Sequence, residues 1–199
     1  VRGYDLSNMS VIEGETGWII VDPLTSVETA RAAMDLVTAE LGERPVAAVI
    51  YTHSHIDHFG GVEGVASREA LASGDIEIIA PEGFIEAVAD ENVLGGQVMS
   101  RRAGYMYGFF LPRTPRGHID SGLGKSPALG SYSIARPTRT ISETGERLTL
   151  DGVEFVFQHA PDTEAPATLT FHLPEHRAWN GGDIVARTMH NLYTLRGAK

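Results

Sequence analysis

The chain contains one stretch that is far richer in metal-binding side chains than the rest, Tyr51-Thr52-His53-Ser54-His55-Ile56-Asp57-His58-Phe59-Gly60-Gly61. Three imidazoles and a carboxylate fall within six positions of it, although the 199 residues include only 8 histidines. Neutral imidazole nitrogens and carboxylate oxygens are the ligands that suit zinc and similar divalent ions. A histidine-rich surface loop is the alternative, but this density favours a metal site.

The spacing of these side chains divides them into two pairs. An apolar run at 46–50 precedes the stretch and predicts a strand that leads into it. In an extended segment His53 and His55 point to the same side, because they are two residues apart. Asp57 and His58 follow, just before a Gly-Gly pair that lets a helix start close to the sheet. We therefore predict that one short loop serves two adjacent ions, with one pair for each.

Length and composition predict a single folded domain. With 199 residues, of which 42% are hydrophobic and 21% charged, the chain is able to bury a core. A net charge of −10 argues against nucleic acid as a partner, since phosphate binding uses clustered Lys and Arg. No apolar run approaches the roughly 20 residues that cross a bilayer. There is no cysteine, so disulfides and thiolate ligands are excluded and the redox compartment stays open.

Apolar periodicity and turn residues predict an alternation of strands and helices. We expect a hairpin from strands at 11–12 and 18–21, a helix from Thr25 or Ser26 to Leu41, a strand at 46–51, a helix at about 61–72, a strand at 76–80, and helical structure over 82–102. Further strands are expected at 148–150, 154–158 and 168–173. This order fits an α/β sandwich.

Residues 103–140 have no clear period and are rich in glycine, proline and aromatic side chains. A stretch of this length without regular structure is usually functional or disordered, and its aromatic content argues against disorder. We predict an insertion that covers or lines the cleft at the metal site. The alternative is that its aromatic side chains only pack beneath a surface loop.

The stretch from Thr52 to Gly61 resembles the T-H-x-H-x-D-H-x-G-G signature of the metallo-β-lactamase superfamily, and here it is complete. The resemblance implies a four-layer αββα sandwich with a one- or two-metal hydrolytic site at the edge of the sheets. The superfamily contains β-lactamases, glyoxalase-II-type thioesterases, tRNA-processing nucleases and alkylsulfatases, so the signature alone does not choose a substrate. The acidic net charge counts against a nuclease.

Three further blocks narrow the choice. They are the opening Val1-Arg2-Gly3-Tyr4-Asp5-Leu6-Ser7-Asn8, Thr163-Glu164-Ala165-Pro166, and His190-Asn191-Leu192-Tyr193-Thr194-Leu195-Arg196-Gly197. Together they resemble the linear alkylsulfatases, which cleave dodecyl-sulfate-type and secondary alkyl sulfate esters. The resemblance covers nearly the whole chain, including the aromatic insertion.

The resemblance implies a ligand set for two zinc ions. The implied ligands of the first ion are His53, His55 and Glu164. Those of the second ion are Asp57 and His58, and Asp183 is the implied bridge between the two ions. The family usually has glutamate at the bridging position, and Asp183 is one methylene shorter. The family also takes another histidine for the second ion from further downstream, so that ligand is expected beyond Lys199.

The family has a helical dimerisation domain and a sterol-carrier-like domain that residues 1–199 do not contain. We therefore expect these residues to be the catalytic-domain portion, an incomplete αββα sandwich, and the full-length protein to be a homodimer. Family members are commonly exported, which implies a periplasmic or secreted location. No export signal is visible, and a cytoplasmic location stays open.

The C-terminal block supplies candidates for catalysis and substrate binding. Arg196 offers a permanently charged fork that suits a sulfate oxyanion. A protonated His190 would bind the sulfate or donate a proton to the leaving oxygen. Tyr193 and Thr194 are further candidates for the sulfate pocket. The alkyl tail needs an apolar groove, which the aromatic side chains of 105–110 would supply.

The predicted function is zinc-dependent hydrolysis of small-molecule alkyl sulfate esters to an alcohol and inorganic sulfate. The alternatives are another hydrolase of the same fold, acting on a thioester, lactam or phosphodiester, and an inactive metal-binding fragment. Glu164 in place of the usual histidine ligand and the C-terminal block argue against the first alternative.

Most of the distant candidates also have a purely structural interpretation. Glu164 is compatible with an ordinary turn residue, Asp183 with a turn cap, His190 with a packed histidine and Arg196 with a solvated side chain. Asp22 ends a predicted strand and is expected to support the metal loop from behind. The histidines without ligand-like spacing, expected to be structural or on the surface, are His118, His159, His172 and His176.

Overall fold

The computed structural model describes residues 1–108, 110–121 and 127–185. Their strands form a five-stranded sheet in the order β1-β2-β3-β4-β5 and a four-stranded sheet in the order β6-β7-β8-β9. The strands are β1 (Ser10–Glu13), β2 (Trp18–Val21), β3 (Val46–Ile50), β4 (Glu77–Pro81), β5 (Arg139–Ile141), β6 (Arg147–Leu150), β7 (Val153–His159), β8 (Leu169–Leu173) and β9 (Ala178–Asn180).

The helical segments all lie between β2 and β5 in the described part of the sequence. They are α1 (Val27–Leu41), the 3₁₀ turn η1 (Ile56–His58), α2 (Val62–Val65), α3 (Arg68–Ser73), α4 (Phe84–Ala89), the π turn η2 (Asp90–Leu94) and α5 (Gly96–Met106). Strands β2 to β5 pair in parallel, whereas β1 with β2 and all pairs of the second sheet are antiparallel.

The central strands of the first sheet are covered on both faces, which explains their continuous apolar sequences. In β2, Trp18 and Ile20 face the helices, whereas Ile19 and Val21 face the second sheet. The alternation follows from the two-residue period of a strand. Burial on both faces fixes the register of β2, since a shift by one residue would exchange its two sets of side chains.

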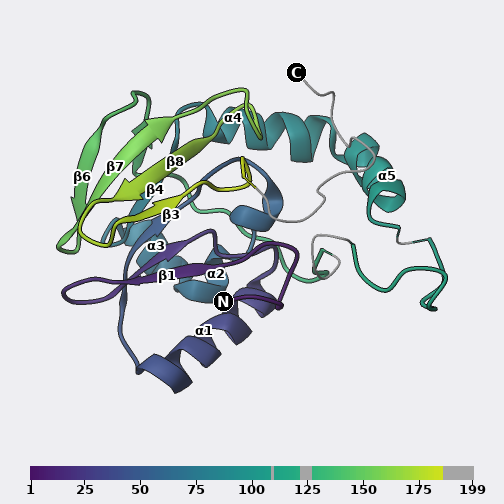
Figure 1. Cartoon of the computed structure of the whole chain (residues 1–199), viewed down its shortest axis with the longest axis horizontal. Helices are drawn as coiled ribbons and strands as arrows, with labels where there is room; N and C mark the ends of the chain where they lie inside the picture. The colour runs from purple at the N-terminus through teal and green to yellow at the C-terminus, as the bar shows by residue number, and fades with distance from the viewer. Residues whose placement is uncertain (109, 122–126, 186–199) are drawn as a thin grey trace.

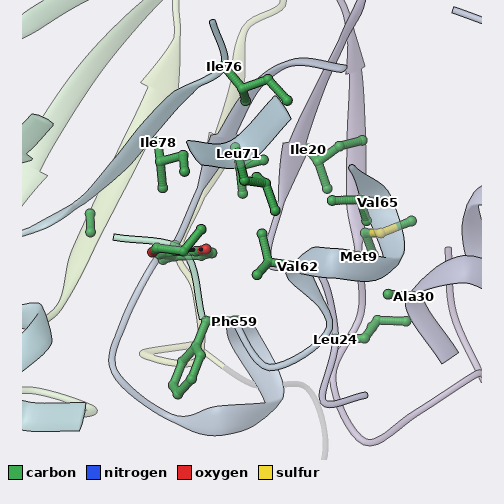
Figure 2. Close-up of a cluster of buried hydrophobic side chains, with 14 of the residues drawn as sticks. Met9, Ile20, Leu24, Ala30, Phe59, Val62, Val65, Leu71, Ile76 and Ile78 are labelled. Carbon is green, nitrogen blue, oxygen red and sulfur yellow. Dashed lines mark hydrogen bonds between the residues drawn. The ribbon is translucent and has the colours of Figure 1, made fainter. Parts of the chain in front are cut away.

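Two cores result from this arrangement. One lies between the first sheet and helices α1 to α4, and Figure 2 shows part of it, with Leu71 of α3 and Val62 of α2 in the same cluster as Ile20 and Ile78 of the sheet. The other lies between the two sheets and includes two stacked phenylalanines of β7, one of which meets Phe171 of β8 edge to face. In Figure 1, α1 and α2 lie on one side of the first sheet and strands β6 to β8 on the other.

The described residues supply three layers of the predicted αββα sandwich. They contain no helix after β5, that is, none that follows the strands of the second sheet. Along β6 and β7, the alternate side chains that point away from the core are exposed or half-buried. The α/β sandwich is confirmed, and the prediction that the sandwich is incomplete in this chain agrees with the described part.

Two predicted helices are interrupted in the structure. The helix expected at 61–72 breaks at Ala66, because Ser67 accepts a hydrogen bond from the Ala70 backbone N–H and caps a second helix, α3. The helical stretch at 82–102 is divided by the π turn η2 and extends to Met106. The irregular stretch therefore starts at 107 rather than 103, and β5 begins at Arg139.

The Gly-Gly pair of the metal loop permits close contact with α1. A β-carbon on Gly61 would collide with the carbonyl oxygens of Pro23 and Ser26. We expect Gly61→Ala to lower the free energy of unfolding by about 1–3 kcal/mol, because the backbone has to move to relieve the overlap. Urea unfolding followed by circular dichroism measures this loss.

Gly96→Ala is the matched control for that substitution. Gly96 lies in α5, and a β-carbon there would meet no atom within 4 Å. Alanine is favoured over glycine in a helix, so this variant should be as stable as the wild type or more stable by up to about 1 kcal/mol. Equal stability of Gly61→Ala and Gly96→Ala would contradict the packing argument.

Candidate metal centre

The histidine-rich loop lies where the two sheets meet. It follows β3 of the first sheet, and its residue His53 forms an isolated β-bridge with Thr168, just before β8 of the second sheet. The Leu169 backbone N–H donates to the Thr52 carbonyl oxygen at 2.8 Å. Ligands from both halves of the chain therefore reach one place, as is usual at the carboxyl ends of parallel strands.

The first group of converging side chains contains His53, His55 and Glu164, whose ligand atoms all lie within 4.8 Å of one another. His53 Nε2 is 3.0 Å from His55 Nδ1, and His55 Nδ1 is 3.5 Å from Glu164 Oε1. Both histidines are buried. Two imidazoles that direct nitrogen atoms at one point beside a carboxylate present the donor set that suits zinc.

The second group contains His53, His58 and Asp183, so His53 belongs to both. His58 Nε2 is 3.3 Å from Asp183 Oδ2 and 3.2 Å from Asp57 Oδ2. The shared histidine makes the two groups neighbours, as a pair of closely spaced ions would require. Each group has donor atoms that suit a divalent cation, and the one ligand nitrogen that His53 offers can serve only one of them.

Asp22 and Thr52 hold the other nitrogens of two of these histidines. The Thr52 hydroxyl donates to Asp22 Oδ2 at 2.8 Å and lies 2.9 Å from His53 Nδ1. Because the hydroxyl proton goes to Asp22, the Thr52 oxygen accepts from His53 Nδ1–H, which leaves the lone pair of His53 on Nε2. His58 Nδ1 lies 2.9 Å from the same Asp22 oxygen, so His58 Nε2 is the nitrogen that faces the second group.

The charges of the second group balance one another. Burial and the neighbouring histidines hold the pKa of His53 well below its ordinary value, so this ring is neutral. Burial opposes protonation of His58, but the charges of Asp57, Asp22 and Asp183 outweigh it and raise the pKa of His58 well above its ordinary value. Burial also opposes ionisation of Asp57, yet the charge of His58 lowers the pKa of Asp57. A nearby positive charge stabilises these carboxylates, and either the proton on the His58 ring or a divalent cation supplies it.

The loop and the two distant carboxylates predicted as ligands are brought together. Asp183 groups with His53 and His58, and its predicted bridging role stays a prediction. Asp22 supports the loop, as expected from its place at the end of β2. The candidates His190, Tyr193, Thr194 and Arg196 lie outside the described residues.

Sequence reasoning missed two residues near this centre. Thr52 was treated only as part of the signature, although its hydroxyl links Asp22 to His53. Glu91 was overlooked, although its Oε2 lies 3.9 Å from His55 Nε2. Glu91 stands among other acidic residues in a helical stretch, and no local pattern distinguishes it from them.

The end of the long irregular segment packs against the metal loop. The Ser133 backbone N–H donates to the Gly60 carbonyl oxygen at 2.7 Å, and the Val27 N–H donates to the Ser131 carbonyl oxygen at 2.9 Å. Asp5, which is buried, accepts from the backbone N–H of Ala128. This part of the predicted insertion therefore runs beside the loop, and a role in lining a cleft stays a prediction.

Asp22→Asn should disturb the histidines without changing the size of the buried side chain. The carboxylate accepts from the Thr52 backbone N–H at Oδ1 and from the Thr52 hydroxyl and His58 at Oδ2, whereas an amide has only one acceptor oxygen, so at least one of these contacts is lost. We expect zinc affinity to fall about 10–100-fold, measured by competition with a chelator. Asp35→Asn, an exposed position on α1, is the control and should bind zinc as the wild type does. Unchanged affinity in Asp22→Asn would refute the positioning role of Asp22.

In the described part of the chain, no helix combines the length and the apolar character needed to cross a membrane.

The chain is similar to sulfatases along its whole length. It is 48% identical over 199 residues to a linear primary-alkylsulfatase of a Pseudomonas species, covering 100% of this chain and 30% of that protein. It is 46% identical to an alkyl/aryl-sulfatase of Saccharomyces cerevisiae, covering 100% of this chain and 31% of that protein.

The fold is also close to that of a solved sulfatase. A double mutant of the sec-alkyl sulfatase PisA1 superposes with a TM-score of 0.93 at 43% identity, covering 100% of this chain and 32% of that chain. The chain thus spans about a third of the length of the proteins that it matches. The model of the metallo-beta-lactamase superfamily matches residues 2–178. Together with the fold and the histidine-rich loop, this match shows that the chain belongs to the metallo-beta-lactamase superfamily.

Proposed function

We propose that the chain is the metal-binding catalytic portion of an alkylsulfatase, which uses two zinc ions to hydrolyse alkyl sulfate esters to an alcohol and inorganic sulfate. The observation that carries the proposal is the convergence of two ligand groups on a shared histidine, His53. The sulfatases to which the chain is similar support the choice of substrate.

Each group would hold one ion. His53, His55 and Glu164 are the proposed ligands of the first ion, and the approach of Glu164 to His55 Nδ1 supports this assignment. Asp57 and His58 are the proposed ligands of the second, with Asp183 as the bridge between the ions. Divalent ions held by these residues would supply a water of lowered pKa, and with it a hydroxide nucleophile near neutral pH.

The substrate would be held by the C-terminal block. A sulfate monoester carries a negative charge that spreads over the sulfuryl oxygens, and Arg196 would pair with these oxygens through a planar, permanently charged guanidinium. His190 would bind the same group or give a proton to the departing oxygen. Tyr193 and Thr194 would add hydroxyl contacts to the sulfate.

An apolar surface is available for the alkyl tail. In the irregular segment and the last turn of α5, the side chains of Tyr105 and Phe110 are 72% and 74% exposed and their rings contact each other at a centroid distance of 5.8 Å. Contiguous exposed apolar patches often mark binding sites. The same surface would also suit the second subunit of the proposed homodimer.

A substrate panel tests the proposed reaction directly. The zinc-loaded chain should release sulfate from dodecyl sulfate and should leave a lactam, a thioester and a bis-aryl phosphate intact. Turnover of one of the other three substrates in place of dodecyl sulfate would favour the corresponding hydrolase. Zinc binding without any turnover would favour an inactive metal-binding fragment.

His55→Ala tests the ligand assignment independently of turnover. Loss of one imidazole from the first group should remove zinc, as determined by elemental analysis. It should also reduce sulfate release by at least about 10–100-fold, which is the usual effect of removing a hydrogen-bond partner of a metal ligand. His172→Ala is the control, because His172 is an exposed residue on β8. Full zinc content in His55→Ala would contradict the assignment.

Arg196→Ala separates substrate binding from metal binding. The variant should keep its zinc and lose about 10²–10³-fold in turnover of dodecyl sulfate, as is typical when one group that stabilises developing charge is removed. Arg31→Ala, at an exposed position on α1, serves as the control for loss of a positive charge. Wild-type turnover in Arg196→Ala would exclude Arg196 from the sulfate site.

A further inference from the structure

His55 is approached by carboxylates at both of its ring nitrogens. Its Nδ1 faces the first ligand group, 3.0 Å from His53 Nε2 and 3.5 Å from Glu164 Oε1. Its Nε2 lies 3.9 Å from Glu91 Oε2. The two nitrogens of an imidazole point in different directions, so Glu91 stands away from the side on which an ion would bind.

The π turn η2 brings Glu91 to this position. The Gly95 backbone N–H donates to the Asp90 carbonyl oxygen at 2.8 Å, a bond between residues five apart that defines this wide turn. Val93 and Leu94 in the same turn are 76% and 81% exposed, whereas the Glu91 side chain is only 15% exposed. A π turn inside a helical stretch often marks a functional position, and here it directs one carboxylate inward.

Metal binding at Nδ1 fixes where the remaining ring proton of His55 must be. An imidazole that ligates through Nδ1 uses that lone pair, so its single proton is on Nε2. His55 Nε2 is shut off from solvent. A buried N–H requires an acceptor, and a negatively charged one also makes the imidazole a stronger ligand. Glu91 supplies a carboxylate that faces this nitrogen.

In the other two histidines of the centre, a side-chain oxygen lies within hydrogen-bonding distance of the ring nitrogen that faces away from the ligand group. His58 Nδ1 lies 2.9 Å from Asp22 Oδ2, and His53 Nδ1 lies 2.9 Å from Thr52 Oγ1. The distance of 3.9 Å at His55 is longer than a hydrogen bond of about 2.7–3.2 Å. A glutamate side chain has three rotatable bonds, so a shift of about 1 Å brings the carboxylate within bonding distance.

We propose that Glu91 is a positioning residue that keeps His55 in its Nε2-protonated form and directs Nδ1 towards the ion held with His53 and Glu164. The proposal rests on the metal-binding part of the function proposed above and not on the identity of the substrate. In this proposal Glu91 acts through His55 and not on the substrate.

Zinc affinity of the whole chain, measured by competition with a chelator, tests the proposal. Glu91→Ala should weaken binding at the first group about 10–100-fold. Glu91→Gln should lose less, because the amide oxygen still accepts from Nε2–H although its charge is absent. Asp90→Asn and Glu86→Gln are matched controls, since both carboxylates are exposed in the same helical stretch, and both variants should match the wild type.

Two spectroscopic measurements separate positioning from a general loss of structure. In the cobalt-substituted chain, Glu91→Ala should alter the visible absorption bands, while its far-ultraviolet circular dichroism stays that of the wild type. In the zinc-loaded, ¹⁵N-histidine-labelled wild type, His55 should appear in the Nε2–H form by nuclear magnetic resonance. If Glu91→Ala does not fold, the comparison of Glu91→Gln with its controls decides the question.

The proposal is overturned if Glu91→Ala and Glu91→Gln keep wild-type zinc affinity and cobalt spectra. It is also overturned if Asp90→Asn loses as much affinity as Glu91→Gln, or if zinc-bound His55 carries its proton on Nδ1. A failure of the proposed function gives a different result. If zinc binding depends on Glu91 but no sulfate is released from dodecyl sulfate, the sulfatase activity is refuted and the role of Glu91 is not.

Discussion

The contact on which the arrangement of the metal centre depends is that of the Asp22 carboxylate with Thr52 and His58. Asp22 stands at the end of β2, and its partners stand in the loop after β3, the next strand of the sheet. All three side chains are buried. In such a setting removal of one partner leaves the others without compensation, which is far more costly than the loss of a surface contact. The end of one strand therefore orients the ligands carried by its neighbour.

The centre concentrates negative charge in a chain that is already acidic. Four of the carboxylates around the histidines are Asp57, Asp183, Glu164 and Glu91, and the formal net charge of the chain is −10. Carboxylates held this close together repel one another unless a positive charge lies between them. Binding of divalent cations would relieve this repulsion, so metal affinity and the stability of the fold are expected to be coupled.

The two halves of the proposed active site have different origins in the chain. The metal-binding half is built from the rigid ends of strands and from loops anchored to both sheets, so the positions of its donors are set by the two buried cores. The proposed substrate-binding half comes from the last ten residues, 190–199, for the sulfate and from the aromatic side chains of 105–110 for the alkyl tail. This division permits one metal platform to serve different substrates in related proteins, because chemistry depends on sites rather than on folds.

The sequence by itself determined the central sheet and the ligands that are close in the chain. Strands β2, β3 and β4 were predictable because burial on both faces leaves continuous apolar runs. The loop from His53 to His58 was predictable because its candidate ligands are close together in the sequence. Glu164 and Asp183 were named through resemblance, since neither has a local pattern. The break at Ala66 was missed because Ser67 is compatible with a helix interior as well as with a cap, and the π turn because it contains no buried residue whose spacing would reveal it.

Only the tertiary structure decided which distant groups meet. It grouped His53 with both sets of ligands, joined Asp22 to His58 over 36 positions of sequence and brought Glu91 to the far nitrogen of His55. The physical reason is that a hydrophobic pattern records which face of an element is buried, but not which element packs against it. A carboxylate that points inward for a function has the same local sequence as one that points into water.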